Sequence, residues 1–357
     1  MKWMQYIVTL IMLFSNKQAY ADVPMPGNCN WESEDGKFYA TSFEGTINLG
    51  TLYIPRDAPV GSIIGQDWVN IPINTSSMKQ LACFSKAAIT TMVSGGTVIN
   101  NITVANNRVP TGSLFSTNIP GVGIAFKTSS INVSTVSGTP PYFPYTVRTG
   151  RLSLLTTPNI PVSVLLVKTA DISMGLQKLN ASSQIITDGT GVIEKFKVNA
   201  TIIRSECVLP VTSKQISVYM GNISISKLKP AGTEGSTLQS FQIPLTDCIS
   251  GSYPSVSNNY FTSSYVNLSL SGNSGSTIID VDKGILGLNS KSTAKGVAVQ
   301  ILQAGSNIPM TLGRSVKMKR VTDGSMSLDF DARYIKTNDS PTAGSANASA
   351  TFTITYK

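Results

Sequence analysis

Two short segments of the sequence combine the side-chain types that bind sugars, namely aromatic rings and planar polar groups. An aromatic ring stacks on the apolar face of a sugar, while carboxylate and amide groups bond its hydroxyls. The first segment is Asp67-Trp68-Val69-Asn70, in which Trp68 and Asn70 share a face if the segment is a strand. A tryptophan is often a largely buried residue, so core packing is the alternative role for Trp68.

The second segment is rich in aromatic residues and proline. Tyr142-Phe143-Pro144-Tyr145 follows two prolines and precedes Arg148, a composition typical of a loop. Loops held by a rigid framework often carry recognition sites, although these rings could instead pack the loop in place. Together the two segments predict the following ligand-binding residues: Asp67, Trp68, Asn70, Tyr142, Phe143, Tyr145 and Arg148.

The catalytic repertoire is restricted because the chain contains no histidine. This excludes Ser-His-Asp and Cys-His catalysis and histidine-ligated zinc. Two carboxylate pairs at i, i+2, Asp280/Asp282 and Asp329/Asp331, have the residue types of glycoside hydrolysis or calcium binding. A solvated strand face beside Arg333 explains the second pair without any reaction. We therefore expect a protein that is not an enzyme, with no catalytic residue, metal or cofactor.

The charge balance is basic, with 28 Lys and Arg against 19 Asp and Glu, a net charge of +9. One local cluster of basic residues contains Arg314, Lys317, Lys319 and Arg320. Such a cluster either contacts an acidic surface or is a solvated face. Neither half of the chain is basic enough to predict a nucleic-acid partner.

The N-terminus has the pattern of an export signal. Met1-Lys2 precede the largely apolar run Tyr6 to Phe14, and Ala19-Tyr20-Ala21 then supplies the small-x-small pattern of a signal-peptidase site. The apolar run is much shorter than the ~20 residues of a membrane-spanning helix. Residues 1–21 are therefore predicted to be a cleaved signal peptide, with a short membrane anchor as the alternative. The mature chain would start at Asp22 and be exported.

The four cysteines indicate two disulfides, because an even number in an oxidising compartment favours pairing. Three pairings are possible. Sequence neighbours are favoured, Cys29–Cys83 and Cys207–Cys248, since each pair then falls within one proposed domain. Trp31 follows Cys29 closely and is expected to pack on the first disulfide. The cysteines lack the CxxC spacing of a metal site.

Strands are expected almost throughout the chain. Alternation of apolar and polar residues marks half-buried strands, and no segment shows a long apolar stripe of helical period. Short β-rich runs separated by Gly, Asn, Ser and Pro are typical of β-sandwiches, so the predicted fold is all-β with two sandwich domains. The clearest alternating runs are residues 195–202, 241–245, 328–334 and 348–357.

A change in composition near residue 185 divides the chain. The polar run Leu179 to Gln184 is followed by Thr187-Asp188-Gly189-Thr190-Gly191, which is typical of a flexible joint. We therefore expect a first domain over residues 22–184, a linker over 185–190 and a second domain over 191–357.

The second domain resembles the pilin domain of chaperone–usher fimbriae over nearly all of its length. The resemblance rests on the order of several segments, the 41-residue separation of Cys207 and Cys248, and a penultimate tyrosine. The segments are Phe196 to Ile202, Cys207-Val208-Leu209, Ile216 to Asn222, Phe241 to Cys248, Gly296 to Ile301, Ile308 to Gly313, Ala332-Arg333-Tyr334, Pro341 to Gly344 and Ala350 to Lys357.

This resemblance implies an incomplete immunoglobulin-like sandwich that lacks its last strand. In the family a periplasmic chaperone covers the open groove first, and a strand donated by an adjacent fimbrial subunit replaces it during assembly at the outer-membrane usher. The alternating C-terminal run fits one edge of such a groove. Its apolar face predicts an assembly edge strand with the residues Ala348, Ala350, Phe352, Ile354 and Tyr356.

The two-domain plan resembles fimbrial tip adhesins, whose first domain is usually a sugar-binding sandwich. The expected mature start, residues 22–36, shows no sustained alternation that would serve as a donor strand. The resemblance therefore implies a secreted adhesin and virulence factor at the fimbrial tip, on the cell surface. It would bind a host-surface glycan as a lectin. A structural tip or initiator subunit that binds a protein, or no ligand, is the alternative.

Overall fold

A computed structural model describes residues 20–21, 28–84, 86–128, 142–149, 152–155, 159–230, 236–253, 260–337 and 340–357. Within these ranges the regular secondary structure is almost entirely β-strand, and the helices are three short 3-10 helices, η1 (Ala105–Asn107), η2 (Val211–Ser213) and η3 (Ile225–Lys227). The predicted all-β fold is confirmed. Most of the predicted signal peptide and the expected mature start at Asp22 lie outside the described residues. Nowhere in the described chain is a helix long and apolar enough to cross a membrane.

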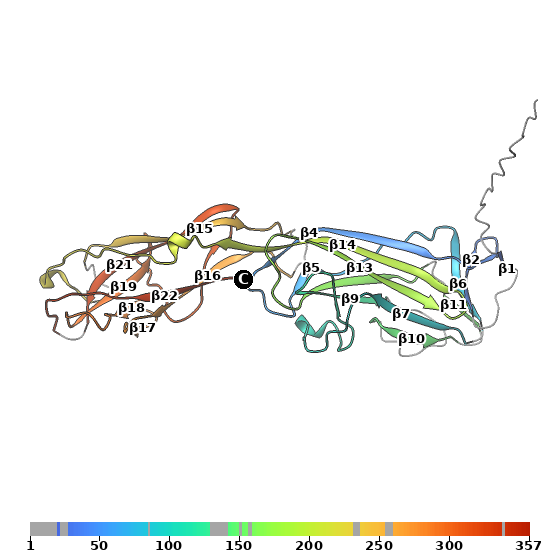
Figure 1. The fold of residues 1–357 in the computed structure, drawn as a ribbon, viewed down its shortest axis with the longest axis horizontal. Coiled ribbons are helices and arrows are strands. Elements are labelled where there is room, and N and C mark those ends of the chain that lie inside the picture. The colour runs from blue at the N-terminus through green and yellow to red at the C-terminus, as the bar shows by residue number, and fades with distance from the viewer. Residues whose placement is uncertain are drawn as a thin grey trace, which may run out of the picture.

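The strands form two bodies placed end to end (Figure 1). The first body contains three sheets around one large core, which includes Trp31, Phe126 and Phe196. One sheet has the order β1 (Tyr20–Ala21), β3 (Phe38–Tyr39), β2 (Cys29–Ser33), β6 (Met78–Phe84), β11 (Leu152–Leu155). The second has β10 (Tyr145–Arg148), β7 (Ala88–Ser94), β13 (Leu176–Thr187), β14 (Gly191–Val208), with β4 (Phe43–Pro55) parallel to β14. The third has β5 (Ile63–Asn70), β12 (Val162–Lys168), β9 (Val122–Thr128), β8 (Phe115–Ser116).

The second body is a smaller sandwich with its own core around Leu268, Phe330 and Tyr356. One of its sheets continues from the end of β14 in the order β15 (Gln239–Ile249), β21 (Gly324–Lys336), β19 (Val297–Gln303), β18 (Ile285–Gly287), β17 (Ile278–Asp280). The other has the order β20 (Val316–Arg320), β16 (Tyr265–Gly272), β22 (Ala350–Tyr356). The last strand, β22, pairs only with β16 in the described chain, so its second edge carries no strand.

The linker predicted over residues 185–190 is wrong, because residues 185–187 end strand β13 and residues 188–190 form the turn of a hairpin. Strands β13 and β14 pair antiparallel up to Thr187 and Gly191, and Ile185 and Phe196 on either side are fully buried in the first core. A tight turn and a flexible joint both use Asp, Gly and Thr, so composition alone does not separate them. Strand β14 instead runs through both bodies: it pairs with β4 as far as Ser205 and with β15 from Glu206. We propose that the domain boundary lies at this exchange of partners.

Both disulfides join the neighbouring cysteines that the sequence favoured. Cys29 and Cys83 face each other across β2 and β6, with their sulfur atoms 2.08 Å apart. Cys207–Cys248 ties the end of β14 to β15 in the second body. Trp31 is completely buried in the same core cluster as the first disulfide, where its ring meets that of Phe43 edge-on at 5.4 Å.

Candidate functional site

A large bulge in strand β5 positions the first predicted segment. Pairing with β12 passes from Ile64 opposite Leu166 to Val69 opposite Val164, so that Gly65 to Trp68 face the single residue between them. A bulge bends a strand and re-aims its side chains. Trp68 has a positive φ of 21°, which is uncommon for a bulky residue. Because of the bulge, the side chains of Asp67 and Trp68 do not follow the regular alternation between the two faces of the sheet.

The bulge brings Trp68 next to Tyr142, so one residue from each predicted segment meets in space. Their ring centroids are 5.8 Å apart, and the planes are tilted by 54°. Lys127 on β9 lies between the two segments: its backbone bridges to Tyr142, and its Nζ lies 4.3 Å from the centre of the Trp68 ring. All three side chains are partly exposed. We call Asp67, Trp68, Arg108, Lys127 and Tyr142 the bulge cluster.

Arg108 completes the bulge cluster from the loop that follows η1. Asn106 and Asn107 both have positive φ, a conformation that asparagine tolerates, and they turn the chain just before Arg108. The guanidinium of Arg108 forms an ion pair with Oδ2 of Asp67. Within the described structure, Oδ1 of Asp67 and Nε of Arg108 are buried and have no hydrogen-bond partner. Both groups therefore have bonding capacity left for another molecule.

Sequence reasoning missed Arg108 and Lys127. Neither residue lies in an aromatic or basic segment, and each is about 40–60 residues from the tryptophan that it approaches. Burial lowers the pKa of Lys127, the charge of Arg108 lowers it further, and Asp67 partly opposes the shift. Only the folded structure brings the two cations to Trp68, Lys127 through strand pairing and Arg108 through the loop that follows η1.

The remaining predicted ligand residues do not join the cluster. Phe143 is 0% and Tyr145 is 8% exposed, and both belong to the first core. Burial raises the pKa of Tyr145 to about 12, and its hydroxyl lies 3.1 Å from Oγ1 of Thr128. Their prediction as ligand contacts is wrong, since apolar rings following a loop are better stabilised in the core. Asn70 is exposed and accepts a hydrogen bond from Ser163, and Arg148 is exposed on β10.

The carboxylate pairs of the second domain have structural partners. Asp329 forms an ion pair with Lys319 at 2.7 Å, and Asp331 accepts a hydrogen bond from Ser240 at 2.6 Å. Asp280 accepts the backbone N–H groups of Asp282 and Lys283, which closes a turn. The described residues contain no group of three or more acidic or cysteine side chains placed to hold a metal ion.

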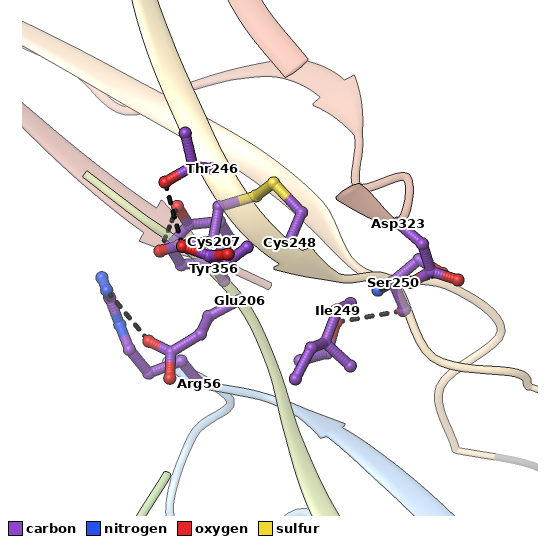
Figure 2. Close-up of a disulfide and its surroundings, with 11 residues drawn as sticks. Arg56, Glu206, Cys207, Thr246, Cys248, Ile249, Ser250, Asp323 and Tyr356 are labelled. Atoms are coloured by element: carbon purple, nitrogen blue, oxygen red, sulfur yellow. Dashed lines mark hydrogen bonds and ion pairs between the residues drawn. A yellow bond between two sulfur atoms is a disulfide. The ribbon is translucent and has the colours of Figure 1, made fainter. Parts of the chain in front are cut away.

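The C-terminal end of β22 contacts the first domain at the junction of the two bodies. Figure 2 shows Arg56, Glu206 and Tyr356 gathered beside the Cys207–Cys248 disulfide. The guanidinium of Arg56 lies 4.7 Å from the centre of the Tyr356 ring and 3.5 Å from Glu206. The N–H of Tyr356 donates to Asp57 at 2.7 Å, and the N–H of Asp57 donates to the carbonyl of Tyr356 at 3.0 Å.

A pocket of about 280 Å³ is lined by residues of β4, β5 and β12. Its lining is largely apolar and includes Leu52, Ile64 and Val164 of the first domain. Tyr253 and Phe261, from the segment between β15 and β16, line it as well, and the N–H of Tyr260 bonds the carbonyl of Gly65 at 3.3 Å. The pocket therefore belongs to the contact between the domains rather than to the bulge cluster.

Comparison with known proteins identifies both halves of the chain. Residues 196–357 match the model of the fimbrial protein family, and residues 46–176 match the MrkD-like receptor binding domain. An uncharacterized fimbrial-like protein of Escherichia coli K12, YcbV, is 31% identical over 160 residues, which cover 44% of this chain and 83% of that protein. A fimbria adhesin protein of Klebsiella pneumoniae is 26% identical over 359 residues, 97% of this chain and 99% of that protein.

Two solved structures are among those similar to the chain. The CupB6 tip adhesin of Pseudomonas aeruginosa is 16% identical, with a TM-score of 0.34, and covers 92% of this chain and 94% of its own. The receptor binding domain of the Klebsiella pneumoniae adhesin MrkD1P is 18% identical, with a TM-score of 0.32, over 51% of this chain and 99% of its own.

The chain belongs to the fimbrial protein family. Within the family it is an adhesin, with a receptor-binding domain followed by a pilin domain.

Proposed function

We propose that this protein is a fimbrial tip adhesin that binds a host-surface glycan with the bulge cluster of its first domain. The observation that carries the proposal is the meeting of Trp68 and Tyr142 at 5.8 Å beside the carboxylate of Asp67, whose Oδ1 has no hydrogen-bond partner among the described residues. A partly exposed aromatic pair offers a surface for the apolar face of a sugar, and the carboxylate accepts its hydroxyls.

Glycan-array binding of the full chain tests this proposal, with Tyr142→Ala as the binding variant. Tyr142 is partly exposed and lies outside the core cluster, so its loss is expected to weaken glycan binding while leaving the melting temperature nearly unchanged. Arg148→Ala is the matched control, because Arg148 is exposed on the neighbouring strand β10 and outside the bulge cluster. Unchanged binding by the folded Tyr142 variant would remove the cluster as the glycan site.

The second domain is proposed to attach the adhesin to the fimbria through the free edge of β22. Phe352 and Ile354 alternate with exposed residues along this strand and are only partly buried against the second core. A strand added at this edge would bond the backbone groups of β22 that Arg56 and Asp57 do not already bond, and it would cover the two side chains. A periplasmic chaperone would supply it first, and an adjacent subunit would replace it at the outer-membrane usher. Accepting a strand from the adjacent subunit would make this domain part of the fibre. The receptor-binding domain that precedes it in the chain supports a position at the fibre tip.

A structural tip or initiator subunit is the second candidate. It is favoured by the burial of Phe143 and Tyr145, which leaves fewer aromatic side chains for a sugar than the sequence suggested. Binding to a host protein without binding to any glycan would establish this alternative.

A further inference from the structure

We infer that the bulge cluster recognises an anionic group, a carboxylate or a sulfate, carried by its glycan. The inference rests on the proposed glycan-binding function and adds the charge class of the ligand.

The charges of the cluster do not balance. Arg108 forms an ion pair with Asp67, which neutralises one cation. The ammonium of Lys127 forms no ion pair or hydrogen bond with any described residue, and it lies instead over the Trp68 ring at 4.3 Å. The cluster therefore carries two cations and one carboxylate. An anion is the ligand that would cancel the remaining charge.

The lysine is held in place rather than free in solvent. Its side chain is partly buried, and a cation over the face of a tryptophan ring is attracted by the ring quadrupole. A partly desolvated cation interacts more strongly with an incoming anion than a fully hydrated one, because the local dielectric constant is lower. Trp68 thus acts as the support that presents the Lys127 charge, with one face of its ring already covered.

The unfilled hydrogen-bonding groups fit an acidic sugar. Among the described residues Nε of Arg108 is a buried donor without a partner, and charge-assisted bonds from guanidinium to carboxylate or sulfate oxygens are strong. Oδ1 of Asp67 is a buried acceptor that no described residue bonds, which would suit a hydroxyl of the same sugar. Tyr142 adds a partly exposed ring beside them. A neutral sugar could bond both groups through its hydroxyls, but it would leave the charge of Lys127 uncompensated.

The test is a glycan array of matched pairs, probed with the full chain. Each sialylated glycan and each sulfated glycan is compared with its uncharged parent, so the two arms separate carboxylate from sulfate as the recognised group. We expect at least one charged series to bind about tenfold or more tightly than its parents, with the difference shrinking as salt is raised.

Variants then assign the preference to the cluster. Lys127→Gln is expected to reduce the charged-over-neutral ratio severalfold, while Lys127→Arg retains it. Lys195→Gln is the matched control, since Lys195 is exposed on β14 of the same domain. Thermal melting establishes that each variant is folded.

The outcomes are distinct. Equal binding of charged glycans and their neutral parents, or a preference that folded Lys127→Gln retains in full, overturns the anionic inference and leaves the glycan-binding function intact. Absence of binding to every glycan overturns the proposed glycan-binding function, and the inference falls with it.

Discussion

Glu194 is a carboxyl group enclosed in the core of the first domain, with 0% of its surface exposed. One oxygen accepts the backbone N–H of Ile160 at 2.9 Å, and the other has no partner within the described structure. Burial raises the pKa of Glu194 from 4.5 to about 8, opposed only in part by that hydrogen bond. The folded protein therefore keeps this side chain protonated at neutral pH.

This raised pKa predicts a loss of stability at alkaline pH. The folded pKa lies above the unfolded one, so the stabilisation is complete below about pH 4.5 and is lost as pH rises through about 8. In Glu194→Gln the group cannot ionise. At pH 9 we expect the free energy of unfolding of this variant to exceed that of the wild type by roughly 4 kcal/mol. The difference between the two proteins should shrink toward pH 5.

Urea denaturation at both pH values measures this difference. Glu44→Gln is the control, because Glu44 is an exposed carboxylate paired with Lys197. A Glu194→Gln variant with the same pH dependence as the wild type would contradict the assignment.

At the scale of the element, β22 has one face turned toward the second core and one turned toward solvent. Phe352 is partly buried against the second core, whereas Thr353 is exposed. Phe352→Asp would place an unpaired charge in the groove where the donor strand is proposed to lie. Burying that charge would weaken strand binding by several kcal/mol. We expect this variant to lose its complex with the cognate chaperone, and Thr353→Asp to retain it.

Co-purification with the chaperone measures this effect. Point substitution is a sharper test than deletion of the strand, because deletion would also remove Tyr356, which is 1% exposed and donates its hydroxyl to the carbonyl of Cys207. Recovery of the Phe352→Asp complex in normal yield would show that β22 is not the assembly edge.

Strand β14 predicts where the first domain can be cut. A fragment of residues 22–184 lacks β14, and with it Phe196, Val198 and Ile202 of the first core. Removing a central strand leaves both neighbours, β13 and β4, without their hydrogen-bond partner. We expect this fragment to be insoluble or unfolded, and residues 22–206 to be folded with a cooperative melting transition. A stable, folded 22–184 fragment would restore the boundary that the sequence suggested.

At the scale of the whole molecule, the junction ties the end of β22 to the first domain. Arg56 contacts Asp57, Glu206 and Tyr356, and its Nη2 also donates to the carbonyl of Ile354 at 2.8 Å. Arg204 holds Glu206 from the other side, so removing Arg56 does not leave that carboxylate alone. Arg56 therefore joins β22 to the first domain.

Arg56→Ala is expected to loosen the two bodies without unfolding either. The Arg56 side chain and its partner Asp57 are both partly exposed, so the destabilisation should be about 1–2 kcal/mol. Small-angle scattering should show a wider distribution of maximum dimensions for this variant, with Arg148→Ala as the surface control. A distribution identical to that of the wild type would mean that the backbone of β14 alone fixes the orientation.

The sequence by itself determined the local features of this protein. Alternation at period two depends only on neighbouring residues, so the run ending in Tyr356 was recognisable as a strand, and the order of segments identified the pilin half. The neighbouring-cysteine pairing also follows from position along the chain, and the structure contains both bonds.

Only the tertiary structure decided what depends on pairing between distant segments. Residues 185–190 became the end of β13 and a hairpin turn, because β14 is needed in the first core on the far side of that turn. Trp68 gained Lys127 as a neighbour through strands β5, β12 and β9, and Arg108 through a loop that no periodicity describes. Phe143 entered the core while Tyr142 remained partly exposed, although the two are adjacent in sequence. Side-chain type sets which contacts are favourable, but strand register and bulges set which side chains meet.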